Sequence, residues 1–215
     1  MPGCLYQPGM KLFSPLLAIA LAGCSVVGIR TGTPEPAYKV LAKAGPVEIR
    51  QYQPRLAASV TVPGDEISAR GAGFRRLAGF IFGGNTAQKS IEMTAPVEQS
   101  AQKIAMTAPV AQTQDASGAW TITFYMPANY TLATLPKPND PGIRIETVPS
   151  ETYAVYRFSG IPGAGAVNRA EKILFANLKT SPWRQIGPLV AWFYDPPWAL
   201  PFVRRNEVAV PVARD

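Results

Sequence analysis

The chain has 215 residues, of which 47% are hydrophobic and 16% are charged. This length and balance permit a packed core in one medium or two small domains, and they exclude a disordered chain. The sequence has no histidine and two cysteines, which excludes Ser-His-Asp and Cys-His triads, the usual zinc cages and haem ligation by histidine.

The N-terminal residues 1–23 have the pattern of an export signal. Lys11 precedes the apolar run Leu12–Ala22, and Gly23 and Cys24 follow. The four residues ending at Cys24 resemble a bacterial lipobox, in which the cysteine is lipidated and becomes the mature N-terminus. The alternative, a buried amphipathic helix, fits poorly because the run is short and lacks a polar face. We therefore predict a lipoprotein signal peptide over residues 1–23 and lipidation of Cys24.

The predicted lipid anchor places the protein in the cell envelope, facing the periplasm. By resemblance to lipoprotein sorting rules, Ser25 after the cysteine favours the outer membrane. Removal of residues 1–23 lowers the net charge from +7 to +6, since Lys11 is the one charged residue there. In an exported protein this excess suits an anionic membrane or an acidic ligand, and we expect no nucleic acid partner. A solvated basic surface is the equally simple alternative.

The first half of the chain reads as strands followed by a helix. Residues 24–37 contain several glycines and prolines and predict a flexible tether. Strands are expected over residues 38–44, 47–52 and 56–62. A helix should begin after Asp65, a favourable N-cap, and end at Gly83–Asn85. Its apolar stripe is predicted to comprise Ile67, Gly71, Phe74, Ala78 and Ile81, with Arg70, Arg75 and Arg76 off that stripe.

Two nearly identical heptapeptides follow, Ile91–Val97 and Ile104–Val110. Each predicts a short extended segment that ends, bulges or runs along an edge at its proline. A local duplication that supplies two adjacent strands explains them, and a binding role is the alternative. We expect Met93 and Met106 to pack in the core.

The second half repeats the order of the first about 97 residues later. Strands are expected over residues 119–126 and 153–160, and a closing hairpin over 188–195 and 207–212. The second helix carries its apolar residues at helical spacing, namely Val167, Ala170, Leu174 and Leu178. Neither half could bury its sheet face alone, so we predict an α+β protein in which the halves share one core. Trp198 and Phe202 lie between prolines and are candidates for an exposed ligand or membrane contact.

The M-T-A-P-V phrase in both heptapeptides resembles the central motif of the SOUL/haem-binding-protein family, whose bacterial members often carry it twice. Further matches occur in the family's order, and the resemblance covers residues 38–212 as one domain. It implies a distorted β-barrel from two pseudo-repeat halves, flanked by two helices. The matching segments are Val47–Tyr52, Gly83–Asn85, Pro136–Pro138, Phe158–Gly160, Tyr194–Pro197 and Arg204–Val208.

The resemblance also implies non-enzymatic, non-covalent binding of haem or another tetrapyrrole in an apolar cleft beside the first helix. Without histidine, only tyrosine or methionine could ligate the iron. We expect no catalytic residue and no bound metal other than that of the ligand, and a monomer. Carried over residue by residue, the apolar wall is Ile67, Phe74, Leu77, Ala78 and Ile81, and the propionate partners are Arg70, Arg75 and Arg76.

Two other functions stay open. An envelope lipoprotein could carry a different amphiphile or serve a structural role. The SOUL fold also resembles GyrI-like domains, some of which use a pocket glutamate and act as hydrolases. Glu171 is the acid to consider for that chemistry, although a solvated helix carboxylate close to Lys172 is the simpler interpretation.

Overall fold

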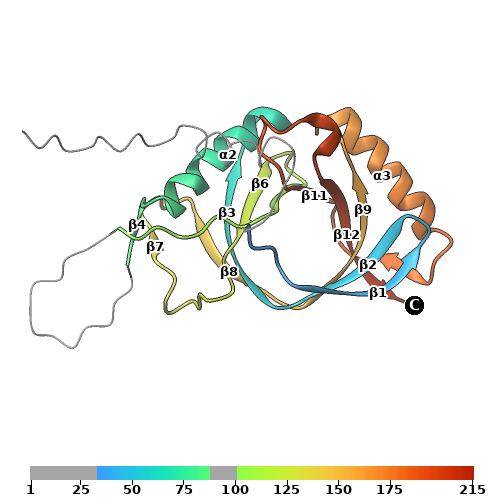
Figure 1. Cartoon of the computed structure of the whole chain (residues 1–215), viewed down its shortest axis with the longest axis horizontal. Helices are drawn as coiled ribbons and strands as arrows, with labels where there is room; N and C mark the ends of the chain where they lie inside the picture. Colours follow the sequence, from blue (N-terminus) through green and yellow to red (C-terminus); the bar gives the residue numbers. More distant parts are fainter. Residues whose placement is uncertain (1–32, 88–100) are drawn as a thin grey trace, which may run out of the picture.

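The computed structural model describes residues 33–87 and 101–215. It shows an α+β protein in which both long helices lie along one side of a curved antiparallel sheet (Figure 1). The helices are α2 (Glu66–Ile81) and α3 (Ala164–Leu178). The strands of the main sheet are β1 (Tyr38–Ala44), β2 (Val47–Tyr52), β3 (Arg55–Val62), β5 (Val110–Gln114), β6 (Trp120–Tyr125), β8 (Arg144–Val148), β9 (Glu151–Phe158), β10 (Trp183–Gln185), β11 (Val190–Phe193) and β12 (Asn206–Arg214).

The sheet has the strand order β1-β2-β9-β12-β11-β5-β6-β3-β8. Strand β10 lies outside this order and pairs with β12. β1 and β8 stand at opposite ends and do not pair with each other among the described residues. The predicted barrel is therefore corrected to an open sheet, because β1 extends outward from β2 as a largely exposed hairpin strand. The order from β2 to β8 is symmetric about the β11–β5 pair, which is consistent with two related halves.

The core divides between the two faces of the sheet. Helix α2 packs on β3 and β6, and α3 packs on β9 and β12. Each helix covers its own apolar cluster. Side chains alternate between faces along a strand, and the opposite face gathers Tyr52, Tyr125, Tyr153, Trp192 and Tyr194 with several alanines. The predicted contacts of α3 are confirmed, since its buried residues are Val167, Ala170, Leu174 and Leu178.

Helix α2 begins as predicted, because the Asp65 carboxylate accepts hydrogen bonds from the amides of Ile67 and Ser68. Its buried face, however, differs from the predicted stripe. Ile67 is 63% exposed and Phe74 is 37% exposed, whereas the buried residues are Ala69, Gly73, Leu77, Phe80 and Ile81. The helix packs through its small residues, since a Cβ on Gly73 would lie 2.4 Å from Cγ1 of Ile122.

Two glycines on α2 give a matched pair of variants. Gly73→Ala is expected to lower the free energy of unfolding by about 1–3 kcal/mol, because its methyl group overlaps the branched Ile122 side chain. Gly79→Ala meets no atom within 4 Å, so the better helix propensity of alanine should raise stability by about 0.5–1 kcal/mol. Urea unfolding followed by circular dichroism measures both. Equal effects of the two substitutions would contradict this packing.

The second heptapeptide shows that one prediction about the repeat motif, the burial of Met106, is wrong. The first heptapeptide, with Met93, lies outside the described residues, as does Cys24. In the second, Ile104 is buried but Met106 is 37% exposed, so Met106 does not pack in the core. Residues 104–109 do not pair with a strand, so no regular alternation directs their side chains toward the sheet. Strand β5 starts at Val110, directly after the proline.

The end of the predicted tether lies against the domain. The carbonyl of Pro34 accepts a hydrogen bond from the Ala108 amide, and that of Ala37 accepts one from Gln53. Glu35 forms an ion pair with Arg205 at 3.0 Å. Residues 34–37 therefore contribute to the surface of the folded domain. Within residues 33–87 and 101–215, no helix is long and apolar enough to cross a membrane.

Candidate functional site

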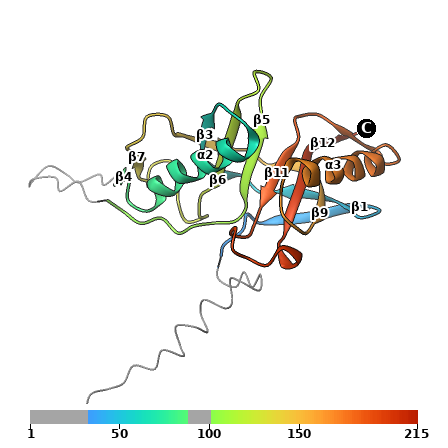
Figure 2. The same cartoon turned by 90° about the horizontal axis from the view of Figure 1, so that it is seen from above.

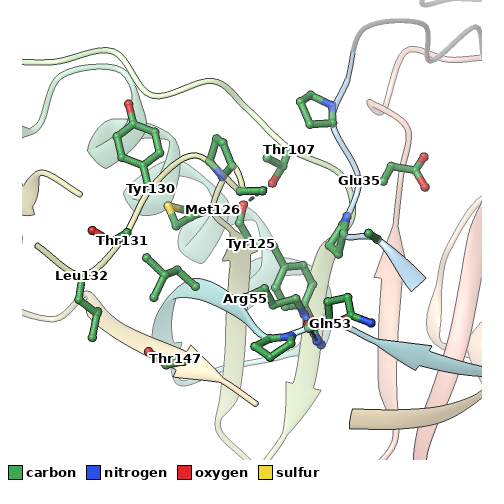
Figure 3. A pocket seen from close by; sticks show the side chains of 17 residues that line it. Glu35, Gln53, Arg55, Thr107, Tyr125, Met126, Tyr130, Thr131, Leu132 and Thr147 are labelled. Atoms are coloured by element: carbon green, nitrogen blue, oxygen red, sulfur yellow. Dashed lines mark hydrogen bonds between the residues drawn. The ribbon is translucent and has the colours of Figure 1, made fainter. Parts of the chain in front are cut away.

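A cavity of about 510 Å³ opens where β3 begins and β6 ends. Its walls come from segments far apart in the chain, so the fold and not any single motif creates it. The N-terminal segment 34–37 forms one side, and the loop after β6 forms another. The lining comprises Pro34–Ala37, Gln53–Leu56, Thr107, Tyr125–Ala128, Tyr130–Leu132 and Thr147 (Figure 3).

Arg55 is the cation of this cavity. Its side chain is only 7% exposed, and its guanidinium lies 4.7 Å from the centre of the Tyr125 ring, beside which Figure 3 shows it. One terminal nitrogen donates to the Gln53 carbonyl and the other to Glu151, each at 3.3 Å. Its buried Nε has no hydrogen-bond partner among the described residues. A guanidinium in the wall of a cavity is suited to pair with a carboxylate or another anion when a donor turns toward the cavity.

Apolar and aromatic side chains surround Arg55. Tyr125 and Met126 are buried, and Leu132 is exposed at the rim. Burial raises the pKa of Tyr125, so its phenol stays neutral near pH 7. Thr107, from the second heptapeptide, donates a hydrogen bond to the Tyr125 carbonyl (Figure 3). The repeat motif therefore holds one wall of the cavity in position.

A buried ionic network lies next to this cavity. The Glu207 carboxylate is fully buried and accepts hydrogen bonds from Arg50 (2.9 Å), Arg205 (2.9 Å) and the Tyr194 hydroxyl (2.8 Å). Burial opposes the charge of Arg50, but its interactions with Glu207 and Tyr52 together outweigh burial and raise the pKa of Arg50 above its usual value. Burial likewise raises the pKa of Tyr194. The network joins β2 to β12 and, through Arg205 and Glu35, holds the segment that walls the cavity.

Arg50, Tyr194, Arg205 and Glu207 belong to segments that resemble the SOUL family, so the motif of the opening strand and the closing motif meet at one buried point. The pairing of β4 (Asn85–Thr86) with β7 (Lys137–Pro138) brings two more of those segments together. Sequence reasoning used the motifs to identify a family and did not foresee these contacts. Arg55 and Tyr125 carried no local signal at all, whereas Thr107 lay within the repeated heptapeptide.

The residues of the predicted apolar wall on α2 differ in exposure. Leu77 and Ile81 are 0% and 1% exposed and belong to the core beneath the helix. These two side chains face β3 and β6, because α2 packs on the sheet along the side of the helix that contains Gly73. Ala78 is half-buried, and Ile67 and Phe74 are exposed. None of these five lines the cavity of about 510 Å³.

The three predicted propionate partners also have separate environments. Arg70 lies 4.5 Å from the centre of the Phe193 ring and donates to the Pro162 carbonyl. Burial lowers its pKa. Arg76 pairs with Asp140 at 2.7 Å, and this hydrogen bond lowers the pKa of Asp140 to about 2. Arg75 is exposed on the helix surface.

Acidic groups in the described ranges do not form a cluster that could hold a metal ion. No three of the histidine, cysteine, aspartate and glutamate side chains in residues 33–87 and 101–215 gather closely enough to hold a metal ion. Glu171 lies in the middle of α3 and does not line the cavity.

Comparison with known proteins agrees with the sequence motifs. The family described as SOUL heme-binding protein matches residues 33–211. Heme-binding protein 2 of Mus musculus is 29% identical over 168 residues, which cover 76% of this chain and 77% of that protein.

The fold is also found in solved structures of low identity. The EcmrR C-terminal domain superposes with a TM-score of 0.52 at 11% identity, covering 83% of this chain and 99% of that one. A hydrolase from Listeria innocua gives a TM-score of 0.52 at 8% identity, covering 80% and 94%. These two likenesses concern the fold alone. The match over residues 33–211 assigns the chain to the SOUL heme-binding protein family.

Proposed function

We propose that this protein binds haem or a related tetrapyrrole without covalent attachment, in the cavity between residues 34–37 and the loop after β6. The observation that carries the proposal is the buried guanidinium of Arg55, with its unpartnered Nε, at an apolar cavity in a member of this family. A volume of about 510 Å³ is typical of small-molecule sites. Arg55 would pair with a ligand carboxylate, and the proposed role is carriage and not catalysis.

Apolar burial and charge supply the binding free energy in this proposal. Burial of a porphyrin face contributes about 25 cal/mol per Å² of apolar area, and the chain has no histidine to coordinate iron. The side chains at the cavity that could approach the metal are those of Met126 and Tyr130. Protein side chains would therefore ligate the iron of bound haem only weakly. We therefore expect no sharp six-coordinate low-spin spectrum from the loaded protein.

Haem titration of the full chain, followed in the Soret band, tests the site. Arg55→Gln is expected to weaken binding by about ten- to a hundredfold, since a hydrogen bond to a charged group contributes roughly 1.5–3 kcal/mol. Arg55→Lys keeps the charge and should lose less. Arg55 also contacts Glu151 and two aromatic rings, so its substitution can change stability as well as binding. Ala128→Trp therefore provides a second, independent variant. Ala128 is exposed at the cavity, so a tryptophan there should obstruct the ligand and leave the core intact.

The surface of α2 remains the alternative position for the ligand. Replacement of Arg70, Arg75 and Arg76 by glutamine is the matched comparison, with thermal unfolding as the control for the lost Arg76–Asp140 pair. The cavity proposal expects near-normal haem affinity in this triple variant. Normal affinity in both Arg55→Gln and Ala128→Trp, with loss in the triple variant, would move the site to α2.

We further propose that Cys24 is lipidated and holds the domain at the periplasmic side of an outer membrane. The support is the sequence pattern from Lys11 to Cys24. Cys24→Ala should abolish metabolic labelling with a radioactive fatty acid, and unchanged labelling would refute the anchor. If haem fails to bind, the same cavity is the place to test another amphiphile with an acidic group.

A further inference from the structure

The loop between β11 and β12, residues 195–205, is held firmly although it lacks regular strand structure. We call it the Trp198 loop. Arg204 donates from Nε to the Ala199 carbonyl at 2.8 Å and from Nη2 to the Pro197 carbonyl at 2.5 Å. The Arg205 amide donates to Asp195 at 2.6 Å, and a 3-10 turn spans Pro201–Val203. An arginine inside the loop thus fixes the loop's own backbone.

This fixed loop presents large apolar side chains to solvent. Trp198 is 67% exposed and Phe202 is 73% exposed. Ile161, which is 68% exposed, lies on an adjoining loop that is joined to this one by the hydrogen bond from the Gly160 amide to the Pro201 carbonyl. Figure 2 shows the red segment that contains the loop extending away from the sheet. Rigid, exposed aromatic groups of this kind mark an interaction surface, since folding gains nothing from displaying them.

The start of the described chain lies at the same end of the domain. Glu35 pairs with Arg205, the last residue of the Trp198 loop. Ten residues lie between Cys24 and Glu35, and a fully extended chain over that interval spans at most about 40 Å. A lipid at Cys24 would therefore keep this end of the domain within about 40 Å of the bilayer. Without residues 1–23 the net charge is +6, and it adds a long-range attraction to anionic headgroups.

We propose that the Trp198 loop is a second membrane contact, which inserts Trp198 and Phe202 into the headgroup region of an anionic phospholipid bilayer. Tryptophan and phenylalanine suit this depth because an aromatic ring gains from partial burial there. The inference rests on the proposed Cys24 anchor for the orientation of the domain. It is independent of haem, because neither aromatic residue lines the cavity.

Fluorescence quenching locates the contact directly. The full chain is mixed with vesicles of phosphatidylethanolamine and phosphatidylglycerol that carry bromine on the acyl chains near the headgroup. We expect quenching in the parent protein and loss of most of it in Trp198→Phe, because Trp192 is buried and Trp120 and Trp183 are half-buried elsewhere. Equal quenching of the two proteins would show that Trp198 does not reach the lipid.

Vesicle sedimentation then measures affinity. Trp198→Ser combined with Phe202→Ser should weaken binding about tenfold or more, and Ile186→Ser, which removes a 56% exposed side chain outside the loop, should not. Equal binding of the parent to neutral vesicles would contradict the anionic preference. A parent dimer that the double serine variant converts to a monomer would assign the loop to self-association instead. Haem titration of that variant separates the proposals, since its haem affinity should be unchanged.

Discussion

Replacing Glu207 by glutamine is expected to lower the free energy of unfolding by about 3–5 kcal/mol. The reason is the burial of the cations that surround it. Arg50 and Arg205 have side chains only 5% and 12% exposed, and loss of the carboxylate charge leaves both without their shared counterion. A buried charge that loses its partner costs far more than the pair contributes when intact.

Glu48→Gln is the matched control for this prediction. Glu48 also pairs with Arg50 at 2.9 Å, but its side chain is 29% exposed, so its loss should cost about 1 kcal/mol or less. Urea unfolding at pH 7, monitored by circular dichroism and by tryptophan fluorescence, gives both values. If the two variants lose the same stability, burial does not determine the contribution of Glu207.

The second large effect is expected from a fragment. Residues 38–130 should fail to fold cooperatively, although they contain a helix and five strands of the main sheet. In the whole protein β2 lies between β1 and β9, and β5 lies between β6 and β11. Both β9 and β11 are missing from the fragment, so the β1–β2 hairpin is separated from the rest and the centre of the sheet becomes an open edge.

Thermal unfolding and the dispersion of amide signals in NMR spectra test the fragment. A broad, non-cooperative transition with poor dispersion is expected. A sharp transition in the fragment, with dispersed signals, would mean that the first half has a core of its own. Equimolar addition of residues 131–215 is the complementary experiment, and it should restore structure if the halves share one sheet.

Sequence reasoning succeeded where local patterns determine structure. β1 and β2 have the predicted bounds because Gly45, with φ of 57°, supplies the turn between them. Helix α3 has the predicted buried face because its apolar residues repeat at helical spacing. On α2 the same method failed, since Gly73 permits close packing on Ile122, whereas large apolar residues such as Ile67 and Phe74 remain outside.

The cavity was beyond such reasoning for a different reason. Arg55, Thr107 and Tyr125 are brought together by the pairing of β3 with β6 and by the path of the chain into β5. Their proximity depends on the long-range register of the sheet, which no short segment encodes. That the sheet is open was missed for the same reason, because it depends on which strands lie at the two ends of the strand order.

The strand order also determines when this sheet can assemble. Val47 pairs with Tyr156, Arg55 with Val148, and Gln112 with Ala191, so the ladders that join the halves close very long loops. Such a topology has a high contact order, and proteins of this kind fold slowly. A chain made from its N-terminus must therefore leave one edge of β2 open until β9 has followed, and both edges of β3 open until β6 and β8 have followed. We therefore expect a holding chaperone to raise the yield of folded protein, because it would shield those early strands from aggregation.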